Sequence, residues 1–223
     1  MGGSDCERIG QGLLGQPANT LSSLAYVLAG ALLLWRAVAG RRHASLGCVV
    51  YAAAVIAVGA GSVAFHGPMP GWGRFAHDLS IAAVLAFVIG YDVALVRGAA
   101  VARGLVIFGA LTGVCAVVLT GWPDAADGLD VLLVAGAVAA EVAAARSPAA
   151  RALADARVWI VGAGVLAIGA ILNALGRTGG PWCDADSLVQ LHAVWHVVTA
   201  FVLWLYGVAV LGPRERARPK IRA

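Results

Sequence analysis

The stretch that decides the fold reads SLGCVVYAAAVIAVGAGSVAFH over residues 45–66 and holds no lysine, arginine, aspartate or glutamate. A helix rises about 1.5 Å per residue, so roughly 20 apolar residues cross the hydrocarbon core of a bilayer. The stretch ends in Ser62 and His66, two polar side chains at membrane depth, where such groups are costly and by default indicate function. It therefore predicts a membrane helix that carries part of a functional site at one end.

Six further apolar runs resemble this one. Overall, 61% of the 223 residues are hydrophobic and 13% are charged, against a charged fraction of about 25% in soluble domains. This composition excludes a soluble enzyme, and the long unbroken runs exclude the alternating strands of a β-barrel. The sequence predicts an all-α integral membrane protein, a single domain over residues 1–223. Its seven transmembrane helices are expected at about 20–39, 45–66, 75–96, 104–121, 128–146, 157–176 and 187–211.

Basic residues mark one side of the expected bundle. Thirteen lysines and arginines fall on the side that holds the C-terminus, and three, Arg8, Arg74 and Arg177, fall on the other side. Cytoplasmic loops carry such an excess. We therefore expect the N-terminus outside and the C-terminus in the cytoplasm, in the plasma membrane of a bacterium. Because the basic residues are placed as in a membrane protein, we expect no nucleic-acid partner.

Four histidines gather at the expected outer ends of the helices. His192 and His196 are four residues apart, so they share one helix face and can chelate one metal ion. If their helix begins at residue 187, they lie roughly 8–14 Å inside it. His66 is expected at the same depth. Three imidazoles with one open position describe a catalytic zinc site; axial ligation of haem and plain packing remain alternatives.

Two further polar side chains lie near these histidines. Ser62 precedes His66 by one helical turn, and its hydroxyl could approach a metal-bound water or a substrate carbonyl. The alternative is a serine that packs a helix interface. Asp78 lies inside the next helix, where it either accepts a proton or caps the helix N-terminus. We expect the adjacent His77 at an interface rather than among the ligands.

Two cysteines fall on the expected outer side of the membrane. Cys6 belongs to the N-terminal segment, and Cys183 precedes the last helix. An oxidising compartment allows a disulfide between them. Two free thiols are the alternative.

These residues together resemble a known family. The pattern is similar to that of the seven-helix hydrolase superfamily that includes the alkaline ceramidases and the adiponectin-receptor (progestin/adipoQ receptor) proteins, and it looks more like the alkaline ceramidase branch. The residues that carry the resemblance are Cys6-Glu7, Asn19-Thr20, Ser22, Ser62-x3-His66, Asp78, Cys183 and Gln190-x-His192-Ala193-x-Trp195-His196.

The resemblance implies a zinc ion held by His66, His192 and His196, with Ser62 and Asp78 beside the zinc-bound water. It implies hydrolysis of the amide of a ceramide, which releases a sphingoid base and a fatty acid. It also implies a disulfide between two residues, Cys6 and Cys183.

The chain departs from the family at the positions of the calcium ligands. Glu7 matches a ligand of the calcium site of eukaryotic members, but Ile9 and Gln16 stand where further ligands are expected, which argues against calcium. Many bacteria make no sphingolipids, so the substrate taken from the bilayer is a ceramide, another lipid amide or an ester. The alternative function is a zinc-containing lipid receptor or sensor without significant hydrolase activity.

Overall fold

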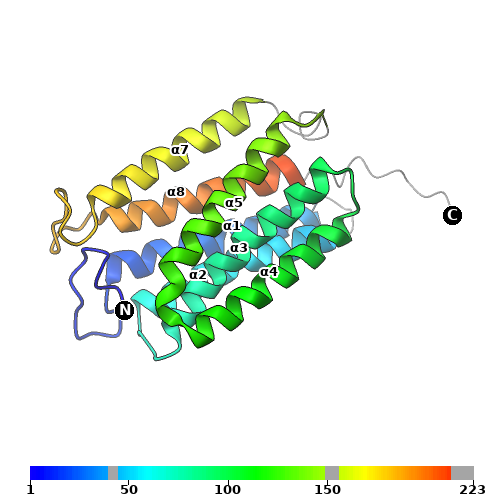
Figure 1. Ribbon diagram of the computed structural model, residues 1–223. Coiled ribbons are helices and arrows are strands. Elements are labelled where there is room, and N and C mark those ends of the chain that lie inside the picture. Colours follow the sequence, from blue (N-terminus) through cyan, green and yellow to red (C-terminus); the bar gives the residue numbers. More distant parts are fainter. Residues whose placement is uncertain (40–44, 149–155, 212–223) are drawn as a thin grey trace.

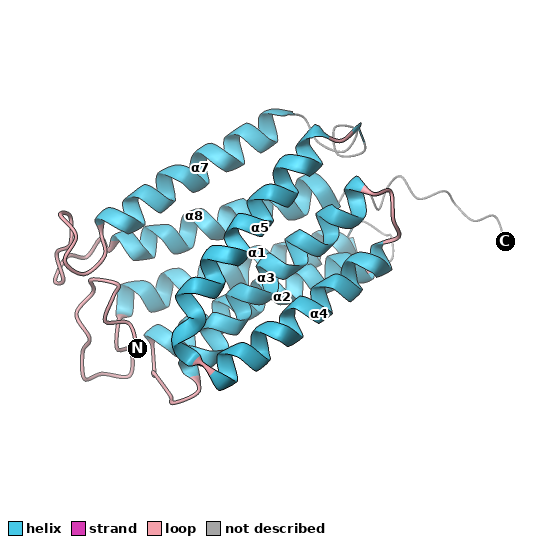
Figure 2. Cartoon of the chain, in the orientation of Figure 1, coloured by secondary structure: helices cyan, strands magenta, loops and turns pink. Residues whose placement is uncertain are grey.

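The structure is a computed structural model, and it describes residues 1–39, 45–148 and 156–211. These residues form helices and loops but no strand (Figure 2). Seven helices in this part of the chain are long and apolar enough to cross a membrane, which confirms the predicted all-helical fold with seven helices of membrane-spanning length. The elements are α1 (Pro17–Ala39), α2 (Leu46–His66), α3 (Gly73–Val96), α4 (Val101–Gly121), the short 3₁₀ helix η1 (Pro123–Ala125), α5 (Ala126–Arg146), α7 (Ala156–Leu175), α8 (Leu191–Tyr206) and the π-helical turn η2 (Gly207–Leu211).

The helices are arranged so that α2 and α3 form the centre of the bundle. α1 packs between α2 and α8, α3 packs against α2, α4 and α5, and α7 packs against α8 (Figure 1). In an 18-residue apolar stretch of each helix, 56% of the residues of α2 and 61% of those of α3 are buried. The corresponding fraction is 17% in α4, 17% in the η1–α5 segment and 11% in α7. The outer helices therefore present apolar side chains to the surroundings, as membrane helices do.

Small residues let α2 approach both of its neighbours closely. A Cβ atom on Gly59 would lie 2.6 Å from Val27 Cγ2 of α1, and one on Gly61 would lie 2.8 Å from Ala76 O of α3. Close backbone approach of this kind drives helix association where no hydrophobic force acts between helices. It fixes the end of α2 that carries Ser62 and His66.

The expected helix boundaries lie within three residues of the observed ones, except for the start of the last helix. α1 begins at Pro17 rather than at residue 20, because the Glu7 carboxylate accepts hydrogen bonds from Ala18 N and Asn19 N at 2.7 and 2.9 Å. Proline suits the first turn of a helix, where its missing N–H is not needed.

The last helix begins at Leu191 rather than at residue 187. Gln190 is extended, and its side-chain amide donates hydrogen bonds to Asp184 O and Ser187 O at 3.0 and 2.8 Å. His192 is therefore the second residue of α8, and the expectation that it lies roughly 8 Å inside the helix is wrong. The histidine pair sits at the helix end, directly under the loops.

Candidate metal centre

Three histidines from two helices meet near the end of the bundle that carries the N-terminus. His66 is the last residue of α2, and His192 and His196 lie one turn apart at the start of α8. Their ring centroids are 5.1 Å (His66–His192), 5.2 Å (His66–His196) and 4.5 Å (His192–His196) apart. One potential ligand atom from each ring lies within 4.8 Å of the other two. This group could therefore hold a metal ion.

A glutamine fixes the orientation of the His66 ring. Gln16 Nε2 donates hydrogen bonds to Gly2 O and Glu7 O, both at 2.8 Å. Its Oε1 then faces His66 Nδ1 at 2.7 Å. Because an amide oxygen only accepts, Nδ1 carries the proton and Nε2 keeps its lone pair for a metal.

The two histidines of α8 are held in the same way. His192 Nδ1 donates to Asn173 Oδ1 of α7 at 2.9 Å. His196 Nδ1 lies 3.2 Å from Asn19 O and 2.9 Å from Ser22 Oγ, both of α1. The backbone carbonyl can only accept, so this nitrogen also carries the proton. Metal-binding histidines commonly use one ring nitrogen for such a bond and the other for the ion.

The opposite nitrogens provide the test of whether a metal fits. His66 Nε2 and His192 Nε2 are buried, and neither has a hydrogen-bond partner within the described part of the chain. Buried polar atoms normally find a partner, and a metal ion would satisfy these two. Imidazole donors suit zinc, copper, iron and nickel. The close grouping of three rings fits one ion better than two axial ligands on opposite faces of a haem.

Asp78 is oriented by two neighbours on its own helix. His77 Nδ1 donates to Asp78 Oδ1 at 2.8 Å, and Arg74 Nε lies 3.6 Å from Asp78 Oδ2. The His77 ring stacks on Phe65 with centroids 4.4 Å apart. Asp78 is the sixth residue of α3, beyond the first turn whose N–H groups need a cap. Its place in the helix does not fit a capping role.

Ser62 lies on the same face of α2 as His66, one turn earlier. Its side chain is almost fully buried, at 1% exposure. The ligand-atom cluster itself contains the three histidines and, among the described residues, neither Asp78 nor another carboxylate. Ser62 precedes His66 on α2, whereas Asp78 lies on α3, which carries none of the three histidines, and neither residue belongs to the ligand cluster.

The N-terminal segment crosses over this end of the bundle and is tied to the α7–α8 loop. Cys6 and Cys183 form a disulfide bond, with Cα atoms 5.6 Å apart. Arg8 makes a bidentate pair with Asp186 at 2.7 and 2.6 Å. Arg8 holds the pKa of the exposed Asp186 carboxyl below its usual value, and Asp186 raises the pKa of Arg8. We call residues 1–16 the N-terminal strap.

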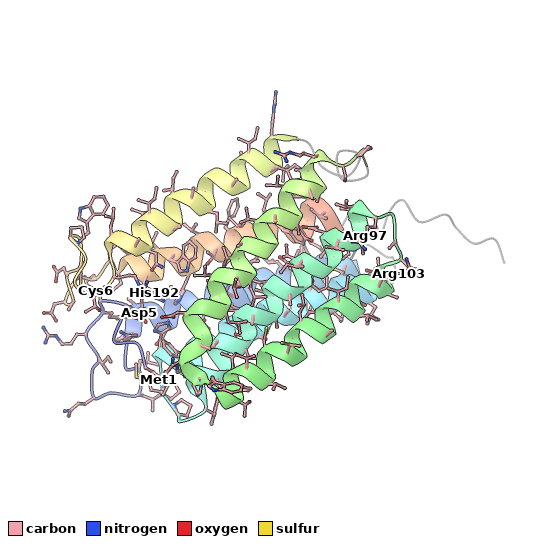
Figure 3. The ribbon with its side chains drawn as sticks, in the orientation of Figure 1. Met1, Asp5, Cys6, Arg97, Arg103 and His192 are labelled. Carbon is pink, nitrogen blue, oxygen red and sulfur yellow. A yellow bond between two sulfur atoms is a disulfide. The ribbon has the colours of Figure 1, made fainter. Side chains whose placement is uncertain are left out.

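Asp5 of the strap points toward the histidines. Figure 3 shows Asp5, Cys6 and His192 together at this end, whereas Arg97 and Arg103 lie at the opposite end. Asp5 Oδ2 is 4.0 Å from His66 Nδ1, and Asp5 Oδ1 is 3.8 Å from His192 Nδ1. Burial raises the pKa of the Asp5 carboxyl, against a smaller lowering by the hydrogen bond from Ser4.

The residues expected to bear on calcium have other roles here. Both carboxylate oxygens of Glu7 cap α1, and the Gln16 side chain bonds His66 Nδ1 and two backbone carbonyls. Ile9 offers no oxygen from its side chain. The expectation against a calcium site stays a prediction.

Sequence reasoning missed the residues that orient the histidines. Asn173 stands out as a polar side chain in a membrane helix, but nothing in its sequence position pairs it with His192. Gln16 and Asp5 belong to a loop segment, where polar residues are ordinary. Their roles depend on how the strap folds back over the bundle, and only a three-dimensional structure shows this.

No protein-family model matches the chain, and no curated protein matches it.

Proposed function

We propose that the protein is a zinc-dependent hydrolase that cleaves the amide of a membrane lipid, in the manner of an alkaline ceramidase. The observation that carries the proposal is the group of three histidines whose Nδ1 atoms donate hydrogen bonds and which each offer one ligand atom within 4.8 Å of the other two. Three imidazole ligands leave one tetrahedral position open, which distinguishes catalytic from structural zinc sites.

The metal would be held by His66, His192 and His196. When bound, zinc would supply a Lewis acid that polarises the amide carbonyl and lowers the pKa of a water molecule. Asp78 would accept the proton of that water and return it to the leaving amine. The His77 and Arg74 contacts hold Asp78 in one orientation, which is how a third group commonly orients a base. Ser62 would donate a hydrogen bond to the oxygen on which negative charge develops.

A membrane site suits a lipid substrate. The apolar outer helices would let acyl chains stay in a hydrocarbon environment while the amide reaches the histidines near the bundle end. The products would be a free fatty acid and a lipid amine. A ceramide fits this description, and so does another N-acyl lipid.

We place the site toward the outer face of a bacterial plasma membrane, with the N-terminus outside and the C-terminus in the cytoplasm. Two observations support this orientation. Basic residues are concentrated on the other side, and the Cys6–Cys183 disulfide belongs to an oxidising compartment. Single-cysteine labelling tests it in a Cys6→Ser/Cys183→Ser background: a membrane-impermeant maleimide should label Asp186→Cys in intact cells but Arg97→Cys only after lysis. The reverse pattern would invert the topology.

The function is tested on protein purified in detergent and returned to lipid vesicles. We expect about one zinc per chain, and release of fluorescent fatty acid from an N-acyl sphingosine that stops on chelation and returns with zinc. An ester-linked analogue of the same acyl chain, run in parallel, separates amide from ester hydrolysis. A protein that holds zinc but cleaves neither substrate would favour the lipid-receptor alternative.

A further inference from the structure

Asp5 is a buried acid that the proposed chemistry does not use. Its side chain is 8% exposed, although it belongs to a loop segment outside the helices. Its two oxygens lie 4.0 and 3.8 Å from the Nδ1 atoms of His66 and His192. One carboxylate thus faces two of the three candidate ligand residues, one from α2 and one from α8.

The position of Asp5 excludes a direct ligand role in the observed arrangement. It lies on the Nδ1 side of both rings, whereas the Nε2 atoms are the ones without hydrogen-bond partners among the described residues. The Nδ1 atoms already donate to Gln16 and Asn173. Any effect of Asp5 on a bound metal is therefore exerted through its charge and position, from the side of the rings opposite the Nε2 atoms.

The strap holds Asp5 in place from both sides. Cys6 follows Asp5 directly and has a φ of 68°, a left-handed conformation that is rare for a residue other than glycine. It is held there by the disulfide to Cys183 and by a hydrogen bond from Cys6 N to Thr178 Oγ1 at 3.0 Å. The turn sends the Cys6 side chain to the α7–α8 loop while the Asp5 carboxylate points to the histidines. Ser4 Oγ donates to Asp5 Oδ1 at 2.9 Å.

We propose that Asp5 is a positioning residue of the metal centre, whose negative charge behind His66 and His192 strengthens metal binding and which the Cys6–Cys183 disulfide keeps in register. This inference relies on the metal-binding part of the proposed function and is independent of hydrolysis.

The physical reason is the charge of the ion. Three neutral imidazoles leave a divalent cation uncompensated in a buried site, and an uncompensated buried charge is expensive. A carboxylate near the N–H groups of the ligands offsets part of this charge. It also makes the opposite ring nitrogens better electron-pair donors to the metal. Groups that orient metal ligands in this way change metal affinity about 10- to 100-fold when they are removed.

The experiment measures zinc affinity by competition with a chromogenic chelator, using the full-length protein in detergent. Asp5→Asn keeps the size of the side chain and removes the charge, so we expect zinc affinity to fall about 10-fold or more. Asp5→Glu restores the charge and should recover part of the loss. Asp127→Asn makes the same substitution at an exposed acid of α5, and it should leave the affinity unchanged.

A second measurement separates positioning from support of the fold. Without metal, Asp5→Asn should melt at the same temperature as the unchanged protein or higher, because it removes a buried charge. A Cys6→Ser/Cys183→Ser variant should lose affinity in the same direction as Asp5→Asn.

Unchanged zinc affinity in folded Asp5→Asn would overturn the inference. A second outcome would also overturn it: metal-free Asp5→Asn melts at a lower temperature, and Asp127→Asn loses as much zinc affinity as Asp5→Asn. If the unchanged protein binds no zinc, the proposed function itself fails, so the two failures are distinguishable.

Discussion

The two ends of the bundle both bury polar side chains, but they treat them differently. Toward the end opposite the histidines, the Tyr206 hydroxyl donates to Asp92 Oδ1 at 2.8 Å, and the Tyr51 hydroxyl donates to Leu203 O at 2.7 Å. Near the N-terminus, the three histidines donate hydrogen bonds through their Nδ1 atoms, and the Nε2 atoms of His66 and His192 have no partner among the described residues. A buried polar group in a membrane helix is therefore not a site in itself. What marks a site is a set of converging atoms whose hydrogen-bonding capacity the chain leaves open.

The largest effect is expected when the imidazoles of His192 and His196 are removed, since this abolishes the difference between the two ends of the bundle. We expect the His192→Ala/His196→Ala variant to lose most of its zinc and all measurable hydrolysis, because one imidazole cannot hold the ion. Metal content by mass spectrometry, with circular dichroism to confirm the fold, measures this. A folded variant with its full zinc content would show that the ligands lie elsewhere.

The next largest effect concerns the base. Asp78→Asn should lower the turnover of a lipid amide about 10²–10⁴-fold, since this is the usual contribution of general acid–base catalysis. Zinc content should stay close to that of the unchanged protein because Asp78 is outside the ligand cluster. Rates and zinc are measured on one preparation. Full turnover by the zinc-loaded variant would refute the catalytic role.

Ser62→Ala should have a smaller effect on the same reaction. Loss of an oxyanion donor costs roughly 10²–10³-fold in rate, which is the upper bound expected here. Zinc binding should survive, because the three imidazoles remain. If Ser62 only packs against a neighbouring helix, the variant will melt at a lower temperature while its rate per folded molecule is unchanged.

At the opposite end, Tyr206→Phe should affect stability alone. It removes the hydrogen bond to Asp92, and interhelical hydrogen bonds in membranes are worth about 0.6 kcal/mol on average and up to about 1.7 kcal/mol. Thermal unfolding measures the loss. Zinc content and hydrolysis should not change. A large drop in either would show that the polar residues at this end also contribute to the metal centre or to catalysis.

The smallest effect is expected for Arg8 and Asp186, the exposed ion pair that joins the strap to the α7–α8 loop. Because Arg8 lowers the pKa of Asp186, the pair stabilises the folded state at neutral pH, and this contribution is lost as the pH falls through the lowered pKa, below the usual 3.8. Asp186→Asn should therefore melt slightly lower than the unchanged metal-free protein at pH 7. The difference should vanish in acid. A difference that persists there would assign it to packing.

Much of the fold and part of the site follow from the sequence. Seven apolar runs are enough to predict seven helices, because a bilayer fixes the length that each run needs. His66, His192 and His196 stand out because polar residues are rare in these runs. The helix starts at Pro17 and Leu191 could not be found from hydropathy. The Glu7 carboxylate caps the first helix, and the Gln190 side chain bonds the loop that precedes the second.

The residues behind the histidines were harder to predict. Asn173 contacts His192 from a different helix, and Gln16 and Asp5 reach the ligands from a loop. Such contacts depend on which helices pack together and on the path of the strap, and neither leaves a periodic signal in a single sequence.

The disulfide also sets an order of events during synthesis. Cys183 follows Cys6 by 177 residues, so at typical elongation rates of about 5–20 residues per second the first cysteine waits roughly 9–35 seconds for its partner. His66 is likewise synthesised long before His192 and His196, which belong to the last helix. Insertion of α8 brings His192 and His196 to His66, and the loop before α8 brings Cys183 to Cys6. The candidate metal centre is thus completed at the final stage of biogenesis, and a chain truncated before α8 lacks two of its three histidines.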